Sequence, residues 1–157
     1  MSASQNLSAL LILLERAEVE RDEALQALQQ ARARADAARM QANQLTDYRQ
    51  EYQQRWTQQF AQRTTVDILG CYQTFGNRLD QAITSQGNVA SHAETHLATA
   101  QALVRERELR VASVRKLIER RRLEQMRGLL RQEQKATDEQ AARAALTAYG
   151  PAMRLSA

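Results

Sequence analysis

The chain has 157 residues, a net charge of +4 and only 4% aromatic residues, so it is long enough for one domain but too poor in large side chains for a thick core. No glycine or proline precedes Gly70, and Pro151 is the only proline. Because tight turns usually draw on these residues, the composition excludes an ordinary compact globule and favours an all-α protein.

The first element is a helix expected over residues 4–62. Its start contains the apolar run Ala9–Leu14, which is too short to span a membrane and has no positive leader, so it predicts neither an anchor nor a signal peptide. From Leu10 onward, steps of four and three residues connect fifteen positions, twelve of them apolar, in the pattern of a left-handed coiled-coil contact stripe. The stripe consists of Leu10, Leu14, Ala17, Arg21, Ala24, Leu28, Ala31, Ala35, Ala38, Ala42, Leu45, Arg49, Tyr52, Trp56 and Gln59.

The joint after this helix is expected over residues 63–67. Residues 64–66 are β-branched and lower the helix propensity there, and Asp67 is a candidate cap for the next helix. Residues 85–88, Ser-Gln-Gly-Asn, offer a rival joint with a better turn composition. We favour the first position because the apolar spacing runs from Leu79 to Ala90 without a phase break.

A second helix is expected over residues 68–149, so that residues 1–150 form a single helical hairpin and residues 151–157 a frayed tail. Its stripe has fourteen positions, of which eleven are apolar if Gly76 is not counted. Two helices with one narrow apolar stripe each need each other, which predicts a long two-helix antiparallel coiled coil. The stripe consists of Tyr72, Gly76, Leu79, Ile83, Gln86, Ala90, Ala93, Leu97, Ala100, Val104, Arg107, Val111, Val114 and Ile118.

The position of the joint also predicts the register of the hairpin. Folding at Thr64 and Thr65 pairs residues whose numbers add to about 130, so that Tyr52 meets Phe75 in an antiparallel seam. The acidic stretch Glu15–Glu23 then lies beside the basic stretch Arg107–Arg115. Such exposed pairs stabilise little but help to fix register and orientation. The prediction is a rod with both chain ends at one end of it.

Residues suited to catalysis or metal binding are sparse. His92 and His96 share a helix face, but Glu94 between them does not follow the zinc-protease pattern and no third ligand is near. Cys71 is the only cysteine, which fits a reduced cytosolic setting without disulfides. There is no glycine-rich phosphate loop, and a two-helix rod has no concave pocket. We therefore expect no enzyme activity, no metal and no cofactor.

Six of the aromatic residues fall between residues 48 and 75, around the joint, and form the aromatic tip. They either fill a wider core or form a binding surface. Because aromatic residues at four-residue steps drift around a helix, they cannot all lie in one seam, and clusters of exposed aromatics are typical of binding sites. We favour a binding surface. The six are Tyr48, Tyr52, Trp56, Phe60, Tyr72 and Phe75.

The stretch Arg105–Arg131 is strongly basic, because ten of its 27 residues are Arg or Lys and four are Glu. Three readings stay open: a solvated surface, a phosphate-binding surface, or a surface matched to an acidic protein cavity. The aromatic residues that stack on bases are at the other end of the predicted rod, which weakens the nucleic-acid reading.

The aromatic tip resembles a known family. The segment Leu45–Tyr52, the segment Tyr72–Phe75 and its continuation through Leu79–Thr84 resemble the flagellar export protein FliJ, and the spacing between Tyr52 and Phe75 suits that family. A looser likeness extends over about residues 5–145, where coiled-coil composition contributes much of the similarity.

The resemblance implies a cytoplasmic, non-catalytic stalk of flagellar type III protein export, and thereby a role in flagellum biogenesis, motility and chemotaxis. Family members fold as two-helix antiparallel coiled coils whose open end sits in the hexameric export ATPase. Their tip contacts the cytoplasmic part of the membrane export gate, and they handle export chaperones. The protein would then lie at the cytoplasmic face of the flagellar base, peripheral to the inner membrane through its partners, without binding nucleic acid.

The resemblance also assigns residues. Gln86 stands where a relative has histidine, so that edge of the gate surface differs from the family. The gate-binding residues implied are Gln41, Leu45, Tyr48, Tyr52, Phe75, Leu79, Ala82 and Gln86. The residues that touch the ATPase ring are not identified by the sequence; candidates near the open end are Arg115, Arg120, Arg121 and Arg122.

Three other functions remain open on the sequence alone. The chain also fits the equivalent stalk of a virulence-type secretion system, from which only the tip segments separate it. It fits a basic coiled coil that binds nucleic acid, whose affinity would fall steeply with salt and require Arg105–Arg131. A purely structural homodimeric coiled coil is the third alternative.

Overall fold

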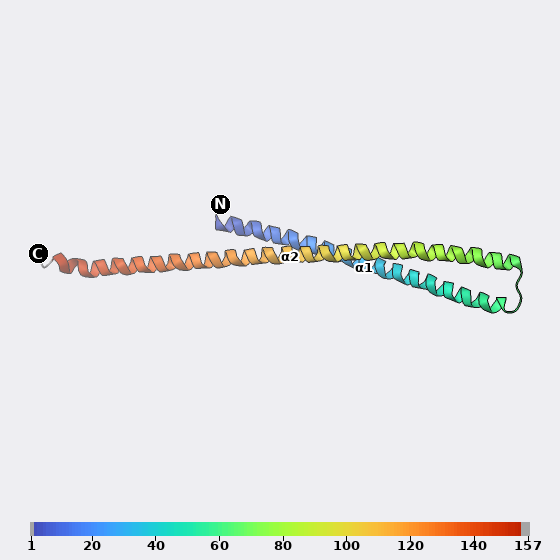
Figure 1. The fold of residues 1–157 in the computed structure, drawn as a ribbon. Helices are drawn as coiled ribbons and strands as arrows, with labels where there is room; N and C mark the ends of the chain where they lie inside the picture. The colour runs from blue at the N-terminus through green and yellow to red at the C-terminus, as the bar shows by residue number, and fades with distance from the viewer. Residues whose placement is uncertain (1, 155–157) are drawn as a thin grey trace. The chain divides into compact units, whose positions relative to one another are not determined.

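The computed structural model describes residues 2–154, and the side chains of residues 2–149. Two α-helices account for almost all of them: α1 spans Ala3–Phe60 and α2 spans Val66–Arg154 (Figure 1). No strand occurs among the described residues. The all-α helical hairpin predicted from the sequence is confirmed.

The joint between the helices covers residues 61–65, and residues 85–88 lie inside α2. Thr65 caps α2: its hydroxyl accepts a hydrogen bond from the Ile68 N–H at 3.4 Å, and its carbonyl accepts one from the Leu69 N–H at 3.1 Å. The expected cap, Asp67, instead lies in the first turn of α2. There its carboxylate still favours the helix, because the N-terminal end of a helix carries a partial positive charge.

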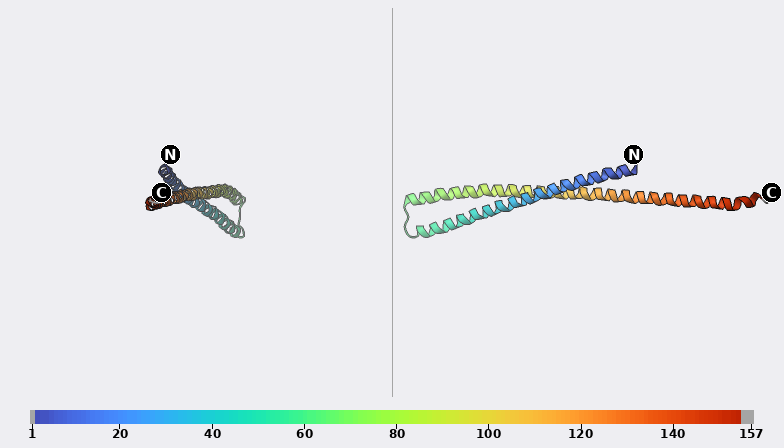
Figure 2. Two further views of the ribbon diagram at one scale, coloured as in Figure 1. Left: turned by 90° about the vertical axis from the view of Figure 1, so that its left-hand side faces the viewer. Right: turned by 180° about the vertical axis from the view of Figure 1, so that it is seen from behind.

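The described chain forms two compact units. The first unit contains residues 2–18 and 110–154, and the second unit is Val19–Leu109. The second unit contains the joint, with residues 19–60 of α1 antiparallel to residues 66–109 of α2 (Figure 2). In each unit, a segment of α1 therefore packs against a segment of α2.

The predicted contact stripes are the buried stripes of the structure. Every stripe position of α1 except Gln59 is buried or partly buried, and so is every stripe position of α2. In α1 the most enclosed stripe residues are all alanines, which fill little volume, whereas α2 contributes larger side chains. The buried hydrophobic residues are Ala17, Ala24, Ala35, Ala38, Leu79, Val104, Val111, Val114 and Ile118.

Ion pairs between the helices confirm the predicted register. In the second unit, Arg39 Nη2 lies 2.8 Å from Glu94 Oε1, and Arg107 Nη1 lies 3.3 Å from Glu20 Oε2. In the first unit, Arg115 Nη2 lies 3.1 Å from Glu18 Oε1. The numbers of these partners add to 127–133, close to the predicted sum of about 130. The acidic stretch of α1 thus lies beside the basic stretch of α2.

The C-terminal part of α2 has no packing partner in α1. Every described side chain from Leu129 to Tyr149 is exposed. The backbone stays helical to Arg154, and the remainder of the tail expected over 151–157 lies outside the described residues. Neither described helix has a stretch that combines the length and the apolarity of a membrane span.

Candidate functional site at the aromatic tip

Five aromatic rings from both helices form a contact cluster beside the joint. Tyr52 of α1 is central: its ring centroid lies 4.8 Å from that of Phe75 and 5.4 Å from that of Tyr72. Trp56 lies 5.7 Å from Tyr72, and Phe60 lies 5.1 Å from the same ring. Offset and edge-on aromatic pairs at these separations are attractive. The cluster therefore holds α1 and α2 together where the chain turns.

Packing accounts for most of the aromatic tip, but not for all of it. Tyr52, Trp56, Phe60 and Tyr72 are partly buried. Tyr48 and Phe75 remain 47% and 40% exposed. The expectation that the six rings cannot share one seam is thus confirmed for Tyr48, whereas the three rings that follow it along α1 do pack across the seam.

Side-chain size explains why the tip is wider than the rest of the second unit. Ala24, Ala35 and Ala38 allow the two helices to approach closely, whereas large rings keep them apart near the joint. Figures 1 and 2 show α1 and α2 separating toward the loop. The rings of Tyr52, Trp56, Phe60 and Tyr72 contact one another between the two helices there.

A polar layer borders the aromatic cluster. Arg49, at a stripe position of α1, donates from Nε to Asp80 Oδ1 of α2 at 3.0 Å. Its pKa is raised chiefly by the hydrogen bond to Asp80 and next by Tyr72, so it stays charged. Its Nη1 is enclosed without a hydrogen-bond partner among the described residues. Gly76 gives the guanidinium its space, because a Cβ there would lie 3.3 Å from Nη2.

The environment of Tyr52 also affects its ionisation. Burial raises the pKa of Tyr52 above its ordinary value, and the neighbouring Tyr72 raises it further. The neutral phenol is therefore the form that fits the cluster, because an ionised ring would lose hydration there.

The structure brings the eight predicted gate-binding residues together in the second unit. Gln86 Nε2 donates to Gln41 Oε1 at 3.1 Å and to the Ala38 carbonyl at 3.3 Å, which joins the two helices at the edge of the set. Leu79 is buried; Leu45, Tyr52, Ala82 and Gln86 are partly buried; Gln41, Tyr48 and Phe75 are exposed. A partner can reach only the last three directly, and the others hold them in place.

The three exposed members and the partly buried Ala82 share one face. Gln41 and Tyr48 each precede a stripe position of α1 by one residue, and Phe75 and Ala82 do the same on α2. In an antiparallel coiled coil, such positions flank the seam on one side. We call this side the tip face, defined by Gln41, Tyr48, Phe75 and Ala82.

Two features of the site were not predicted. The Arg49–Asp80 layer was missed, although an arginine at a coiled-coil stripe position is a signal for a paired acid on the facing helix. The exposure of Leu11, Ile12 and Leu13 in the first unit was missed as well. The apolar run Ala9–Leu14 contains these three residues. A continuous apolar run in a two-helix protein must leave some side chains uncovered, because only one face of each helix packs against the other helix.

The candidate ATPase-contacting arginines lie in the first unit. Arg115 pairs with Glu18 at 3.1 Å, and Arg121 lies 3.6 Å from Glu124 one turn on. Arg120 and Arg122 have no ion pair within the described part of the chain. Exposed Leu117, Leu123, Met126, Leu129 and Leu130 accompany them along α2. This surface combines uncompensated positive charge with uncovered apolar side chains.

The candidate ligand and nucleophile side chains are scattered along α2. His92 and His96 are exposed on α2, and no group of three or more candidate ligands gathers anywhere in residues 2–149. Cys71 is free and exposed. The geometry thus defines a class: a two-helix antiparallel coiled coil with an exposed aromatic face beside its joint.

Comparison with known proteins specifies the family. The family model described as flagellar FliJ protein matches residues 6–149. This chain belongs to the FliJ family, and so is a component of flagellar type III protein export. Neither a curated protein nor a solved structure matches it significantly. The match covers most of both helices. It includes the tip segments Leu45–Tyr52, Tyr72–Phe75 and Leu79–Thr84.

Proposed function

We propose that this chain is the non-catalytic stalk of the flagellar export apparatus, coupling the hexameric export ATPase to the cytoplasmic part of the export gate. It works in the cytoplasm at the flagellar base, reaches the inner membrane only through its partners, and handles unloaded export chaperones. Membership of the FliJ family supports the export role. The two surfaces described above support a protein with two different partners.

The observation that carries the proposal is the tip face. Tyr48 and Phe75 expose aromatic surface, while Tyr52 and Leu79 behind them are held by packing. Rigid, half-exposed aromatics bind partners with little loss of side-chain freedom. The tip face is the surface that contacts the export gate.

The basic apolar surface of the first unit is assigned to the ATPase. Arg120 and Arg122 are free to pair with carboxylates of a partner, and the exposed leucines beside them supply apolar contact area. Insertion between several ATPase subunits would cover both kinds of side chain at once. Long-range attraction between opposite charges would also speed the encounter.

The gate contact is tested by measuring binding of this chain to the purified cytoplasmic part of the export gate. Tyr48→Ala should weaken binding by about tenfold or more, as expected for a hot-spot aromatic. Gln50→Ala is the matched control, because Gln50 is exposed on the same helix but follows a stripe position and so lies off the tip face. Equal affinities of the two variants would refute the assignment of the tip face.

The ATPase contact is tested by the hydrolysis rate and oligomeric state of the purified export ATPase, with and without this chain. Stimulation together with ring formation supports the stalk role. If the folded chain has no effect on either, the coupling proposal is wrong, and salt-dependent nucleic-acid binding becomes the next function to measure.

A further inference from the structure

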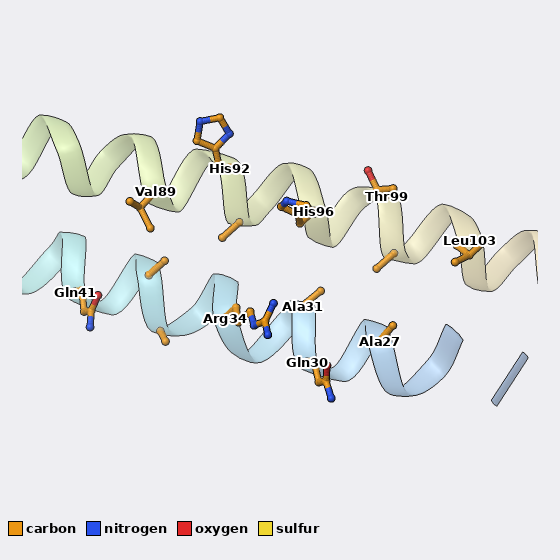
Figure 3. Close-up of a pocket in the computed structure, with 14 residues that line it drawn as sticks. Ala27, Gln30, Ala31, Arg34, Gln41, Val89, His92, His96, Thr99 and Leu103 are labelled. Atoms are coloured by element: carbon orange, nitrogen blue, oxygen red, sulfur yellow. The ribbon is translucent and has the colours of Figure 1, made fainter. Parts of the chain in front are cut away.

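An apolar groove of about 690 Å³ runs along one side of the seam in the second unit. Six of its fourteen lining residues are alanines, contributed by both helices. In Figure 3, Ala27 and Ala31 of α1 face α2, and Val89 and Leu103 are on the α2 side. Val89 and Leu103 are 51% and 37% exposed. Apolar side chains therefore line both walls of the groove.

The two sides of the seam differ sharply in chemistry. Groove residues such as Ala37 and His92 precede stripe positions, whereas Arg39 and Glu94 follow them and form an ion pair of 2.8 Å across the opposite side. That opposite side is therefore polar and already bridged. None of the ion pairs that join the two helices in the described residues involves a residue that lines the groove, so its apolar walls are left open.

The charge of the groove is one-sided. No carboxylate lines it, and Arg34 is its only charged lining residue, accompanied by the imidazoles of His92 and His96. A partner that buries apolar surface here meets no negative side chain, so the groove selects acidic groups.

The groove also prolongs the tip face. Along α2, seven-residue steps lead from Phe75 and Ala82 to Val89, His96 and Leu103, so these residues form one column beside the seam. The bond between Gln86 and Gln41 marks the boundary, because Gln41 belongs both to the groove and to the tip face. The second unit thus presents one continuous apolar side.

We propose that this groove receives an acidic amphipathic helix of a partner protein, which packs onto α1 and α2 as a third helix. The part of α1 that lines the groove runs from residue 27 to residue 41, which is about four turns or 21 Å of helix. Alanine walls let a third backbone approach closely, and the partner's carboxylates fall beside Arg34 and the two histidines. The proposal does not depend on the ATPase or the gate.

The chemistry of the groove argues against nucleic acid as its occupant. Backbone binding to nucleic acid needs several cations in a row, and binding of bases needs stacking rings. The groove lining has one arginine and no phenylalanine, tyrosine or tryptophan. An amphipathic helix fits the lining better than nucleic acid does. Its apolar face would pack on the alanines, and its flanking carboxylates would lie beside Arg34.

The test uses a fluorescent synthetic peptide of about 20 residues, long enough to form helix when bound, with leucines at coiled-coil contact positions and glutamates beside them. A matched peptide carries lysine in place of each glutamate. Fluorescence anisotropy with the full chain measures both affinities. We expect the glutamate peptide to bind about tenfold or more tightly than the lysine peptide, and Arg34→Glu to reverse that preference.

Two tryptophan variants locate the binding surface. Ala37→Trp fills the groove and should weaken binding of the glutamate peptide by about tenfold or more. Ala33→Trp is the control, because Ala33 is exposed between two stripe positions and lies outside the groove. Circular dichroism of both variants verifies that the helices are intact.

Three results would overturn the proposal. The first is equal affinity for the two peptides, and the second is equal loss of binding in the two tryptophan variants. The third is self-association of the chain that Ala37→Trp abolishes while neither peptide binds, since the groove would then be covered by a second copy. Gate binding and ATPase stimulation are read out separately, so failure here leaves the proposed function intact.

Discussion

Arg49 of α1 and Asp80 of α2 are joined by a 3.0 Å ion pair, with Arg49 at a position of the seam that is otherwise mostly apolar. Gly76 leaves room for the guanidinium, and Tyr72 lies against it. An alternative register of α1 on α2 would separate the pair and leave the partly enclosed arginine without its acid, whereas an exposed ion pair adds little to stability. The layer therefore fixes the alignment of the tip more than it stabilises the fold.

Replacing the arginine separates these two effects. Arg49→Leu removes a partly enclosed charge and the unpartnered Nη1, so the free energy of unfolding should change by less than about 1 kcal/mol. The variant should also form more dimers, because the seam no longer prefers one partner and register. Urea denaturation and sedimentation velocity measure the two properties. A large loss of stability with no new oligomers would show that the layer is a stabilising element instead.

The glycines of α2 should respond differently to alanine. A Cβ at Gly87 meets nothing within 4 Å, so Gly87→Ala should stabilise the chain by roughly 0.5–1 kcal/mol through its helix propensity. Gly76→Ala should gain less or lose stability, because its Cβ would crowd Arg49 Nη2 at 3.3 Å. Thermal unfolding of both variants gives the comparison. Equal gains would mean that the guanidinium moves aside without loss.

The sequence predicted the stripes well because coiled-coil spacing is a local signal repeated over many turns. The prediction was wrong for one stripe position, Gln59. This residue is exposed, and Phe60 packs in its place near the end of α1. There the wide aromatic rings part the helices, so the regular spacing no longer decides which side chain faces the partner. The cap was missed for a similar reason, since choosing Thr65 over Asp67 depends on where the helix starts within one or two residues.

The groove was beyond sequence analysis for another reason. The apolar stripes predict which residues meet in the seam. They do not predict which flank of the seam is left accessible to a partner. That choice depends on the ion pairs of the opposite flank, such as Arg39 with Glu94, and on Gln86 bonding Gln41 at its edge. The sequence places His92 and His96 on one helix face, but their place along the groove required the structure.

Alkaline pH should loosen the aromatic cluster. Because burial raises the pKa of Tyr52 in the folded state, folding favours its neutral form. The full stability is present below the ordinary tyrosine value of about 10 and is lost as the pH rises through the raised folded value. Trp56, the only tryptophan, lies 5.9 Å from the Tyr52 ring and reports the change by fluorescence.

Tyr52→Phe is the control for this titration. The variant keeps the ring contacts but has no proton to lose at position 52, so its Trp56 signal should be less sensitive to pH above the ordinary tyrosine pKa of about 10. If the wild type and the variant give superimposable titrations, the alkaline transition belongs to another group.

Tyr52→Ala and Phe75→Ala should both leave the helices formed, and both should weaken gate binding. Tyr52 contacts Trp56, Tyr72 and Phe75, so its removal leaves a cavity and lowers stability by roughly 2–4 kcal/mol. Phe75 is 40% exposed, so the loss of stability should be smaller than for Tyr52. Urea denaturation followed by circular dichroism ranks the two. Loss of helicity in both would show that the cluster acts only as core.

Removal of all residues after Leu129 should separate the two proposed interactions. Every described side chain from Leu129 to Tyr149 is exposed, so the truncation removes little packing, and the second unit should keep its stability. Gate binding, which depends on Tyr48 and its neighbours, should stay within about twofold of the full chain, because no tip contact is lost. Stimulation of the export ATPase should fall, since the basic apolar surface of α2 is shortened.

A charge-matched control for this truncation, Arg131→Gln in the full chain, tests whether one lost cation explains the effect. If the truncated chain is folded but loses both activities, the tip and the first unit act as one binding site, and the division of the stalk between two partners is wrong.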